Sequence, residues 1–363
     1  MPEYFVGLMS GTSLDGVDAV LAASRGGRFR VLRSTRVSYP SRLRRRLLAM
    51  LHPGHDELHR AAILGNELSD LYARAVRRLL SRAGVGARAV ACIGCHGQTV
   101  RHRPGAGYTM QLVNGARLAE RTRMTVVCDF RSRDIAAGGE GAPLAPALHS
   151  AVFGAARRDR VIVNVGGIAN LTWLPARGAV IGFDCGPGNC LLDAWILGKR
   201  RMAFDPGGSW GARGRVVPRL LAKFLAHPYF RRPPPKSTGR EMFSLEWLAG
   251  LLAGNERPVD VQATLTELTA LAIARAVRRY CARAREVYVC GGGARNRALL
   301  SRLARHLPGM HVATTSALGI APEHVEALAF AWLARQALHR MPGNLPSVTG
   351  ARGSRVLGAI YAA

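Results

Sequence analysis

Apolar and polar positions define a hairpin at the start of the chain. Residues 4–9 form an apolar run of strand length, residues 10–16 form a polar segment that contains glycine, and residues 17–22 are apolar again. A further strand is expected over 29–37. The pattern therefore predicts two strands joined by a polar glycine turn, with a third strand after them.

The residues that follow change to a helical period. Leucine and alanine recur three and four positions apart, which predicts a long helix over 56–82. Short apolar runs and one helical segment then alternate, with strands near 89–94, 108–112 and 124–128 and a helix near 114–121. Alternation of this kind is typical of an α/β fold.

The layout of the N-terminus is repeated from residue 161. Strands are expected over 161–165, 171–174 and 180–183, and the first two are joined by a turn around Gly166 and Gly167. Helices are expected near 193–197, 216–226, 260–283, 296–306 and 322–338. Because each half starts with a glycine-turned hairpin, we predict a duplicated, two-lobed α/β architecture with an interlobe cleft. We expect an N-terminal lobe of residues 1–128 plus 341–363 and a C-terminal lobe of residues 129–340.

Prolines and an aspartate refine the second half. Asp260 is predicted to be the N-cap of its helix, and Pro322 is expected in the first turn of the last long helix. The stretch 231–239 contains three consecutive prolines, so we expect an ordered loop or flap there.

The large positive net charge does not by itself indicate a nucleic-acid-binding protein. The 363 residues carry a formal net charge of +28, which raises the question of a nucleic-acid partner, because basic surfaces release counterions from polyanions. However, nearly all basic residues are arginines scattered along the chain, and the densest cluster, within 42–46, lies on one face of an expected amphipathic helix. We therefore expect no specific nucleic-acid site, with a polyanion-binding helix face as the alternative.

The cysteines indicate a cytoplasmic protein. Seven cysteines are odd in number and too widely spread for a disulfide framework, which favours reduced thiols. Cys92 and Cys95 form a C-x-x-C pair, but no second ligand pair lies at zinc-finger spacing, so packing is favoured over a metal or redox site. We expect neither a secretory leader nor a membrane span.

Three glycine-rich turns, at 10–13, 166–167 and 291–293, each follow an apolar strand. In such turns backbone N–H groups can converge on a phosphate, because no Cβ blocks the approach. None of the three has the layout of a Walker A or dinucleotide-binding motif. Each alone can also be a tight structural turn, but three together favour a site for nucleotide phosphates.

Residues 7–18 (GLMSGTSLDGVD) resemble the N-terminal signature of the bacterial anhydro-N-acetylmuramic acid kinases, which belong to the sugar kinase, actin and heat-shock chaperone superfamily. The resemblance extends along the whole chain through CHGQT at 95–99, DFRSRDIA at 129–136, GAPL at 141–144, NVGGIAN at 164–170, FDCGPGN at 183–189, PKSTGRE at 235–241 and the segment 323–332. The departures are the high arginine content and Cys185, where a small or hydroxyl residue is expected. Neither affects an expected catalytic group.

The resemblance implies a duplicated ribonuclease H-like (actin-like ATPase) fold and an ATP-dependent kinase acting in cell-wall recycling. The family's substrate has O6 tied to C1 in an internal ether, so a water must attack C1 while O6 takes the γ-phosphoryl group of ATP. The resemblance places the base that activates this water at Asp184. Its position after an apolar strand and before Gly186 agrees with that role, while an aspartate that caps the following turn is the alternative.

The resemblance also implies which residues bind the nucleotide. These are Gly11, Thr12, Ser13, Leu14, Asp15, Gly16, Val17, Asp18, Gly166, Gly167, Gly291, Gly292 and Gly293, the last three as part of an adenosine motif. Mg²⁺ is expected to arrive with the nucleotide phosphates, so no protein metal site is predicted. Asp15 and Asp18 either orient the waters of Mg²⁺ or brace the loop.

For the sugar, Arg131 is the candidate partner of the lactyl carboxylate, because a guanidinium fork suits a carboxylate. Glu326 is expected to accept hydrogen bonds from sugar hydroxyls or to brace the attacking water. His96 either lines the sugar site or makes a local hydrogen bond. For both Arg131 and Glu326, a structural ion pair is the alternative.

Other functions stay open at this point. The chain could be a kinase for another sugar, an ATP-gated binding module like the actin and chaperone branches, or a polyanion binder. The expected partners are a small sugar and ATP, with no membrane and no specific nucleic acid, and a homodimer is left open.

Overall fold

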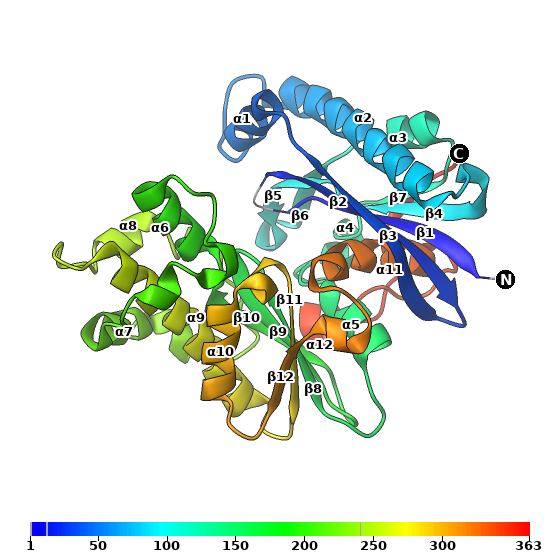
Figure 1. The fold of residues 1–363 in the computed structure, drawn as a ribbon. Coiled ribbons are helices and arrows are strands. Elements are labelled where there is room, and N and C mark those ends of the chain that lie inside the picture. Colours follow the sequence, from blue (N-terminus) through cyan, green and yellow to red (C-terminus); the bar gives the residue numbers. More distant parts are fainter. Residues whose placement is uncertain (1, 12–13, 240) are drawn as a thin grey trace. The chain divides into compact units, whose positions relative to one another are not determined.

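The computed structural model describes residues 2–11, 14–239 and 241–363. The chain divides into two compact units, one of Met1–Val152 with His324–Ala363 and the other of Phe153–Glu323 (Figure 1). These boundaries differ from the predicted ones, because the segments 129–152 and 324–340 belong to the first unit. The reason is that the helix after residue 324 packs against the sheet of the first unit.

The first unit is built on a mixed sheet in the order β13-β7-β4-β1-β2-β3. The predicted hairpin and third strand are confirmed as the antiparallel strands β1 (Glu3–Met9), β2 (Gly16–Arg25) and β3 (Arg28–Ser38). Strands β4 (Val90–Cys95) and β7 (Val126–Cys128) run parallel to β1, and β13 (Ala359–Tyr361) closes the edge.

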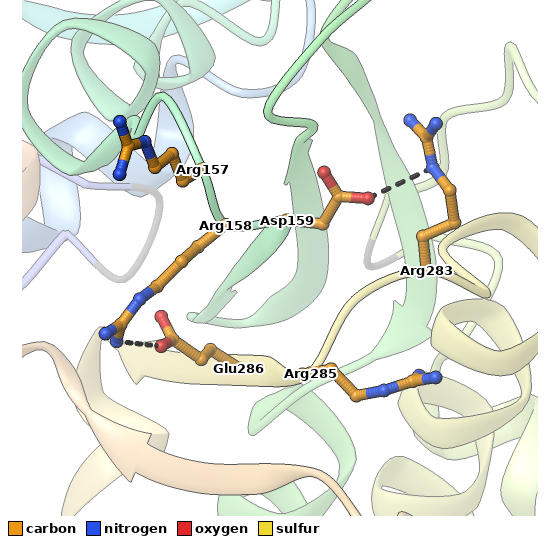
Figure 2. Close-up of a pocket in the computed structure, with 6 residues that line it drawn as sticks. All are labelled: Arg157, Arg158, Asp159, Arg283, Arg285 and Glu286. Atoms are coloured by element: carbon orange, nitrogen blue, oxygen red, sulfur yellow. Dashed lines mark hydrogen bonds and ion pairs between the residues drawn. The ribbon is translucent and has the colours of Figure 1, made fainter.

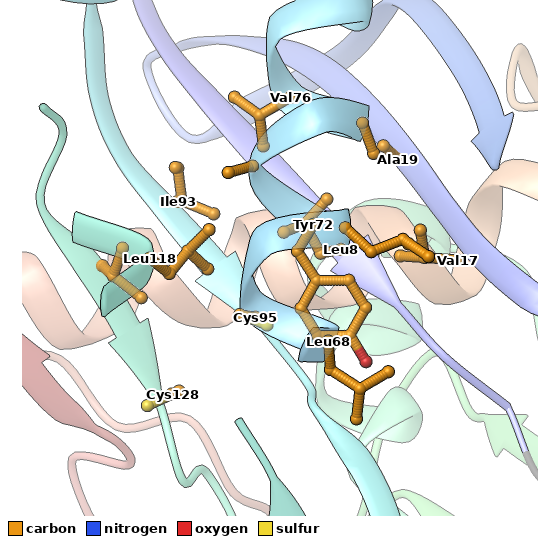
Figure 3. Close-up of a cluster of buried hydrophobic side chains, with 14 of the residues drawn as sticks. Leu8, Val17, Ala19, Leu68, Tyr72, Val76, Ile93, Cys95, Leu118 and Cys128 are labelled. Carbon is orange, nitrogen blue, oxygen red and sulfur yellow. The ribbon is translucent and has the colours of Figure 1, made fainter. Parts of the chain in front are cut away.

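One face of this sheet packs on α2 (Glu57–Ala83), with α1 (Ser41–Ala49) and α3 (Gly115–Thr122) beside it (Figure 1). Leu8 and Val17 of the hairpin meet Leu68 and Tyr72 of α2 in a buried apolar cluster (Figure 3). The basic helix α1 buries Leu43 and Leu47 as expected. Leu48 of the same helix is 43% exposed.

The other face of the sheet packs on α11 (Val325–Leu338). Successive strand residues point to opposite faces, so Gly7 faces α11 while Leu8 faces α2. A Cβ on Gly7 would lie 1.9 Å from the carbonyl oxygen of Ala327, and one on Gly94 would lie 1.9 Å from that of Phe330. The two glycines therefore let α11 lie directly on the sheet, which is why this helix belongs to the first unit.

Shorter elements complete the first unit. A separate pair of strands, β5 (Gln98–Arg103) and β6 (Tyr108–Leu112), lies outside the main sheet, and only β6 was predicted. Three short helices are also present: α4 (Ser132–Ala136), α5 (Ala145–Phe153), which ends at the start of the second unit, and α12 (Pro346–Thr349). Pro322 opens a short 3₁₀ turn (Pro322–His324) directly before α11.

The second unit repeats the strand order of the first. Its sheet runs β10-β9-β8-β11-β12, with an antiparallel hairpin and third strand followed by two parallel strands. The strands are β8 (Arg160–Val165), β9 (Ile168–Leu174), β10 (Ile181–Pro187), β11 (Glu286–Cys290) and β12 (His311–Thr314). The predicted duplication of a ribonuclease H-like α/β unit is thereby confirmed.

The helices of the second unit are α6 (Cys190–Arg200), α7 (Pro218–Leu225), α8 (Leu245–Ala249), α9 (Pro258–Tyr280) and α10 (Arg297–His306). The prediction that Asp260 is an N-cap is wrong, because α9 already begins at Pro258, where a proline fits the first turn. Asp260 instead accepts a hydrogen bond from the backbone N–H of Arg215 at 2.8 Å. Of the predicted loop 231–239, Arg231 is instead the last residue of a 3₁₀ turn (Pro228–Arg231), whereas 232–239 is neither helix nor strand, as its prolines predicted.

All seven cysteines are buried and carry free thiols, as predicted. Within the described residues, no helix combines the length and the apolar character that crossing a membrane requires.

Candidate active site

In the first unit, three parallel strands end at one edge of the sheet. Ser10 follows β1, His96 follows β4 and Asp129 follows β7. The backbone N–H of His96 donates to the carbonyl of Leu8 at 3.0 Å, which continues the ladder past the end of β4. Ligands of open α/β sheets bind outside the carboxyl ends of such strands, so this edge is the candidate site of the unit.

The first glycine turn joins β1 to β2. Leu14 and Val17 are 1% and 0% exposed, so their side chains belong to the core and only their backbones are available to a nucleotide. Asp15 lies 2.6 Å and Asp18 3.8 Å from the guanidinium of Arg36 on β3, an arrangement that braces the turn. The predicted phosphate contacts at residues 12 and 13 lie outside the described residues.

A buried polar network lies beneath this turn. The Ser10 hydroxyl contacts Gln98 Oε1 at 2.8 Å and also meets the Tyr39 hydroxyl, which lies 3.1 Å from the hydroxyl of Tyr72. Gln98 Nε2 donates to the carbonyl of Gly11 at 3.2 Å. Burial raises the pKa of Tyr39 to about 12, so its hydroxyl stays a neutral hydrogen-bonding group. The network fixes the backbone from which the turn starts.

Arg131 and His96 form a buried pair at the same edge. Arg131 Nη2 lies 2.9 Å from His96 Nε2, and Arg131 Nη1 donates to the carbonyl of Gly141 at 2.7 Å. Because a guanidinium can only donate, Nε2 of His96 accepts, and Nδ1 carries the proton that it donates to the carbonyl of Ser10 at 3.1 Å. Both ring nitrogens are thus engaged, and His96 links Arg131 to the first glycine turn.

Burial and the neighbouring Arg131 charge lower the pKa of His96 to about 3, so its ring is neutral. Burial also lowers the pKa of Arg131, to about 10, while Glu326 in the first turn of α11 and Asp134 favour its charged form. Arg131 is therefore a charged group taken largely out of water. Such a cation favours an anionic ligand, which agrees with the prediction for Arg131 and places Glu326 in its electrostatic surroundings.

The Asp134 carboxylate, which accepts several hydrogen bonds, holds the segment that carries Arg131. Asp134 is fully buried and accepts hydrogen bonds from Asn344 Nδ2 at 2.7 Å, Thr349 Oγ1 at 2.8 Å and the backbone N–H of Gly141 at 2.8 Å. These bonds tie the C-terminal stretch to the turn that follows α4. Asp134 is thus a structural anchor, a role that the sequence analysis did not assign.

In the second unit, Asp184 shares a row with the ends of the strands that lead into two glycine turns. It lies within β10 and not after a strand as predicted, because β10 continues to Pro187. Asp184 on β10 is paired with Asn170 on β9, Asn170 with Asn164 on β8, and Asn164 with Cys290 on β11. Neighbouring strands are spaced by about 4.8 Å, so Asp184 lies about 10 Å from the end of β8. The second and third glycine turns directly follow β8 and β11. The register therefore brings the predicted base and two predicted phosphate turns to one edge.

The second turn is fixed by the start of α6. The carbonyl of Gly166 accepts from the backbone N–H of Asn189 at 2.8 Å, and the carbonyl of Gly167 accepts from those of Gly188 and Cys190 at 2.9 and 3.0 Å. Because the N–H groups at the start of α6 hold the carbonyls of Gly166 and Gly167, the turn has a defined backbone conformation, which a phosphate-binding turn requires.

The third turn lies against the end of β8. Gly291 has a φ of +77°, and a Cβ there would lie 2.3 Å from Asn164 Oδ1 and 2.9 Å from the carbonyl oxygen of Val165. After the turn, Asn296 caps α10 by accepting from the backbone N–H of Leu299 at 2.9 Å. The close approach of β8 and β11 thus explains why glycine is needed at this strand end.

Asp184 is a partly buried carboxylate held by the proline-rich segment. Its Oδ2 accepts from the backbone N–H of Thr238 at 3.0 Å, and its own N–H donates to the carbonyl of Lys236 at 3.1 Å. The Tyr229 hydroxyl donates to the carbonyl of Asp184 at 2.7 Å. Burial raises the pKa of Asp184 to about 6, although the Thr238 N–H and the Lys236 charge favour the ionised form. The group is thus ionised at neutral pH and still basic enough to take a proton.

Within each unit the structure brings the sequence-predicted residues together at strand ends, but several supporting residues were not predicted. Gln98, Lys236 and Thr238 lay in motifs that carried the family resemblance, without an assigned role. Tyr39 and Tyr72 gave no signal, because an aromatic residue beside an apolar run is usually core. Cys92 and Cys95 are buried, and the described residues contain no group of three or more His, Cys, Asp or Glu that could hold a metal.

The duplicated strand order, with glycine turns at strand ends and a carboxylate on a neighbouring strand, defines the class of actin-like ATPase folds. A sequence model of the family described as "Anhydro-N-acetylmuramic acid kinase" matches residues 3–363. Relatives with the same description come from Nitrosomonas europaea, which is 57% identical over 99% of this chain and 100% of its own length, and Nitrosospira multiformis, which is 56% identical over 99% of each. A third, from Cupriavidus metallidurans, is 54% identical over 99% of this chain and 97% of its own. The chain belongs to the anhydro-N-acetylmuramic acid kinase family.

Proposed function

We propose that this protein converts 1,6-anhydro-N-acetylmuramic acid, ATP and water to N-acetylmuramic acid 6-phosphate and ADP. The observation that carries the proposal is Asp184, a partly buried carboxylate with a pKa raised to about 6, in the same row of the sheet as the strand ends that lead into two glycine turns. The reaction belongs to bacterial cell-wall recycling, and the cytoplasmic location predicted from the cysteines is part of this proposal.

The base role follows from the chemistry of the anhydro bond. O6 carries no proton, so an ordinary sugar kinase base has nothing to remove. Asp184 takes a proton from water, the water oxygen bonds to C1, the C1–O6 bond breaks, and O6 attacks the γ-phosphorus as the bond to ADP breaks. One water is consumed, and its hydroxyl becomes the C1 hydroxyl of the product.

For the nucleotide, we infer that the turns around Gly11, Gly166 and Gly291 bind phosphates through backbone N–H groups. The described residues hold no cluster of metal ligands, so Mg²⁺ would come with the nucleotide and keep most of its waters. Asp15 and Asp18 are less suited to orienting the waters of Mg²⁺, because both carboxylates lie beside the guanidinium of Arg36. Bracing the loop is the role that the ion pairs favour.

For the sugar, Arg131 is the proposed partner of the lactyl carboxylate, and Glu326 of the sugar hydroxyls. Arg131 already uses two of its donors on Gly141 and His96, which fixes the plane of its guanidinium. A guanidinium with a fixed plane loses little entropy when it binds a carboxylate. His96 is a positioning residue in this arrangement.

The test is phosphate transfer to the anhydro sugar. Purified protein is incubated with ATP and with either 1,6-anhydro-N-acetylmuramic acid or its ring-opened form, and we expect product only from the first. A single turnover in ¹⁸O-water, with rapid trapping of the product, should label the C1 hydroxyl and leave the phosphate ester unlabelled. Preference for a sugar without the anhydro bond, or fast ATP hydrolysis that needs no sugar, contradicts the proposal.

A further inference from the structure

The second unit contains a cavity of about 510 Å³ between the C-terminal half of α9, the segment 225–236 and β10. Five basic side chains line it: Arg231, Lys236, Arg275, Arg278 and Arg279. Its remaining lining is apolar or aromatic, including Phe230 and Tyr280, together with Cys185, and it contains no acidic residue. The cavity is therefore strongly cationic with an apolar wall.

The charge of this cavity is not balanced from within. Across residues 2–11, 14–239 and 241–363, none of its five basic side chains forms an ion pair. A second arginine-rich pocket of the same unit differs: there Arg158 pairs with Glu286 at 2.7 Å and Arg283 with Asp159 at 3.0 Å (Figure 2). High arginine content alone therefore does not explain the first cavity, because carboxylates accompany the arginines in the second.

The spacing on α9 concentrates this charge. Ala272, Arg275, Ala276 and Arg279 recur on one helical face, so two small side chains leave room between two guanidinium groups. Like charges four residues apart on a helix repel each other, and an anion between them would remove that repulsion. Lys236 adds an ammonium that rests on the face of Tyr229, 4.7 Å from its ring centroid.

We propose that this cavity binds a small phosphorylated molecule, a sugar phosphate or nucleotide. Guanidinium groups match phosphate oxygens in pairs, and Phe230 and Tyr280 offer an apolar wall for the ring that carries the phosphate. The volume is in the range of small-molecule sites, which favours such a ligand over a nucleic acid. The inference goes beyond the proposed kinase reaction.

The cavity is distinct from the candidate base. Asp184 is not among the residues that line it. Cys185, which does line it, sits at an irregularity in the register of β10 and packs with Phe183 and Ala276 in a buried apolar cluster. The two sites share Lys236, whose carbonyl accepts from the backbone N–H of Asp184 and whose charge favours the ionised carboxylate. A ligand in the cavity would therefore contact the segment that holds the base without contacting its carboxylate.

The test is calorimetric titration with two probes, inorganic pyrophosphate and glucose 6-phosphate, in the presence of a saturating non-hydrolysable ATP analogue. We compare the parent protein with R275S/R279S and with the matched control R157S/R285S. The control removes the same charge from the second pocket, at two arginines that form no ion pair in the described residues and carry no dashed line in Figure 2.

We expect one binding site per chain, with affinity lowered at least tenfold in R275S/R279S and changed less than twofold in the control. In phosphate-free buffer, R275S/R279S should melt at the same temperature as the parent or higher, because a repulsive pair is gone, and pyrophosphate should no longer raise its melting temperature. Equal weakening in both variants, unchanged binding in R275S/R279S, or binding of a single-stranded oligonucleotide but of neither probe would overturn the proposal. None of these readouts depends on kinase turnover.

Discussion

The two units share one strand order but carry opposite, partly buried charges at their candidate sites. The first holds the guanidinium of Arg131 and the second the carboxylate of Asp184. Burial favours the neutral form of both groups. It lowers the pKa of Arg131 to about 10 and raises the pKa of Asp184 to about 6. Arg131 nevertheless stays fully charged at neutral pH, while Asp184 is brought within reach of a proton-transfer step.

The difference lies in what surrounds each charge. Arg131 donates to the Gly141 carbonyl and to His96, and Glu326 and Asp134 favour its charge. The Asp184 carboxylate has the Thr238 N–H and the field of Lys236. A well-compensated charge suits recognition, because it is fixed in place, whereas a poorly compensated carboxylate suits a base. In the proposed mechanism, the same framework therefore serves binding in one unit and proton transfer in the other.

The largest effect is expected from Asp184→Asn. The change keeps the size and the acceptor for the Thr238 N–H but removes the proton acceptor. We expect kcat to fall at least about a hundredfold, the usual scale of lost general-base help, with ATP and sugar still bound. Single-turnover phosphate transfer and calorimetric binding measure the two effects. Near-normal turnover in the folded variant would show that Asp184 is not the base.

Arg131→Ala should have the next largest effect. Loss of a hydrogen bond to a charged group costs about 1.5–3 kcal/mol, so sugar affinity should fall by about ten- to a hundredfold while ATP affinity is largely kept. Arg131→Lys keeps the charge but not the planar fork, so we expect it to restore little of the loss. The readout is calorimetric titration of each substrate. An unchanged affinity for the sugar would contradict the recognition role.

Activity and stability should depend on pH through Asp184 and not through Arg131, which stays charged near neutral pH. kcat/KM should rise with pH through about 6, as Asp184 ionises, and then level off. Because the folded pKa is raised from 3.8 to about 6, the folded state binds the proton more tightly, and the free energy of unfolding falls as pH rises between these values.

Asp184→Asn lacks the charge and should therefore be more stable than the parent above this window, by about 3 kcal/mol, and equally stable below it. Denaturant unfolding at pH 4 and pH 7.5 measures the difference. A gain of the same size at both values would mean that the charge of Asp184 is not its cause.

Much of the fold could be predicted from the sequence because its signals are local. Short apolar runs joined by glycine turns marked both hairpins, and Asp184 stood out as a carboxylate after an apolar run, with the family resemblance adding its role. The membership of α11 in the first unit could not be predicted, because it depends on Gly7 and Gly94 meeting a helix more than 200 residues away in the sequence. The start of α9 was misplaced because Pro258 outweighed the capping tendency of Asp260.

For the candidate site, the sequence singled out some charged residues and the glycine turns, but it did not reveal the residues that support them, among them Asp134 and Lys236 as well as two tyrosines. Tyr39 and Tyr72 lie in apolar surroundings and would be assigned to the core from sequence. Only the long-range contact between their hydroxyls and Ser10 shows that they support the first glycine turn.

That support is the basis of the smallest expected effect. Tyr39→Phe removes one buried hydroxyl, so we expect the free energy of unfolding to fall by about 1 kcal/mol and the KM for ATP to rise a few-fold, with kcat little changed, because the turn is less well fixed. The matched control is Tyr280→Phe, since the buried Tyr280 hydroxyl has no hydrogen-bond partner among the described residues. It should leave stability equal or higher and the KM for ATP unchanged. If both variants behave alike, or if Tyr39→Phe changes stability alone, the network is part of the core and does not position the phosphate turn.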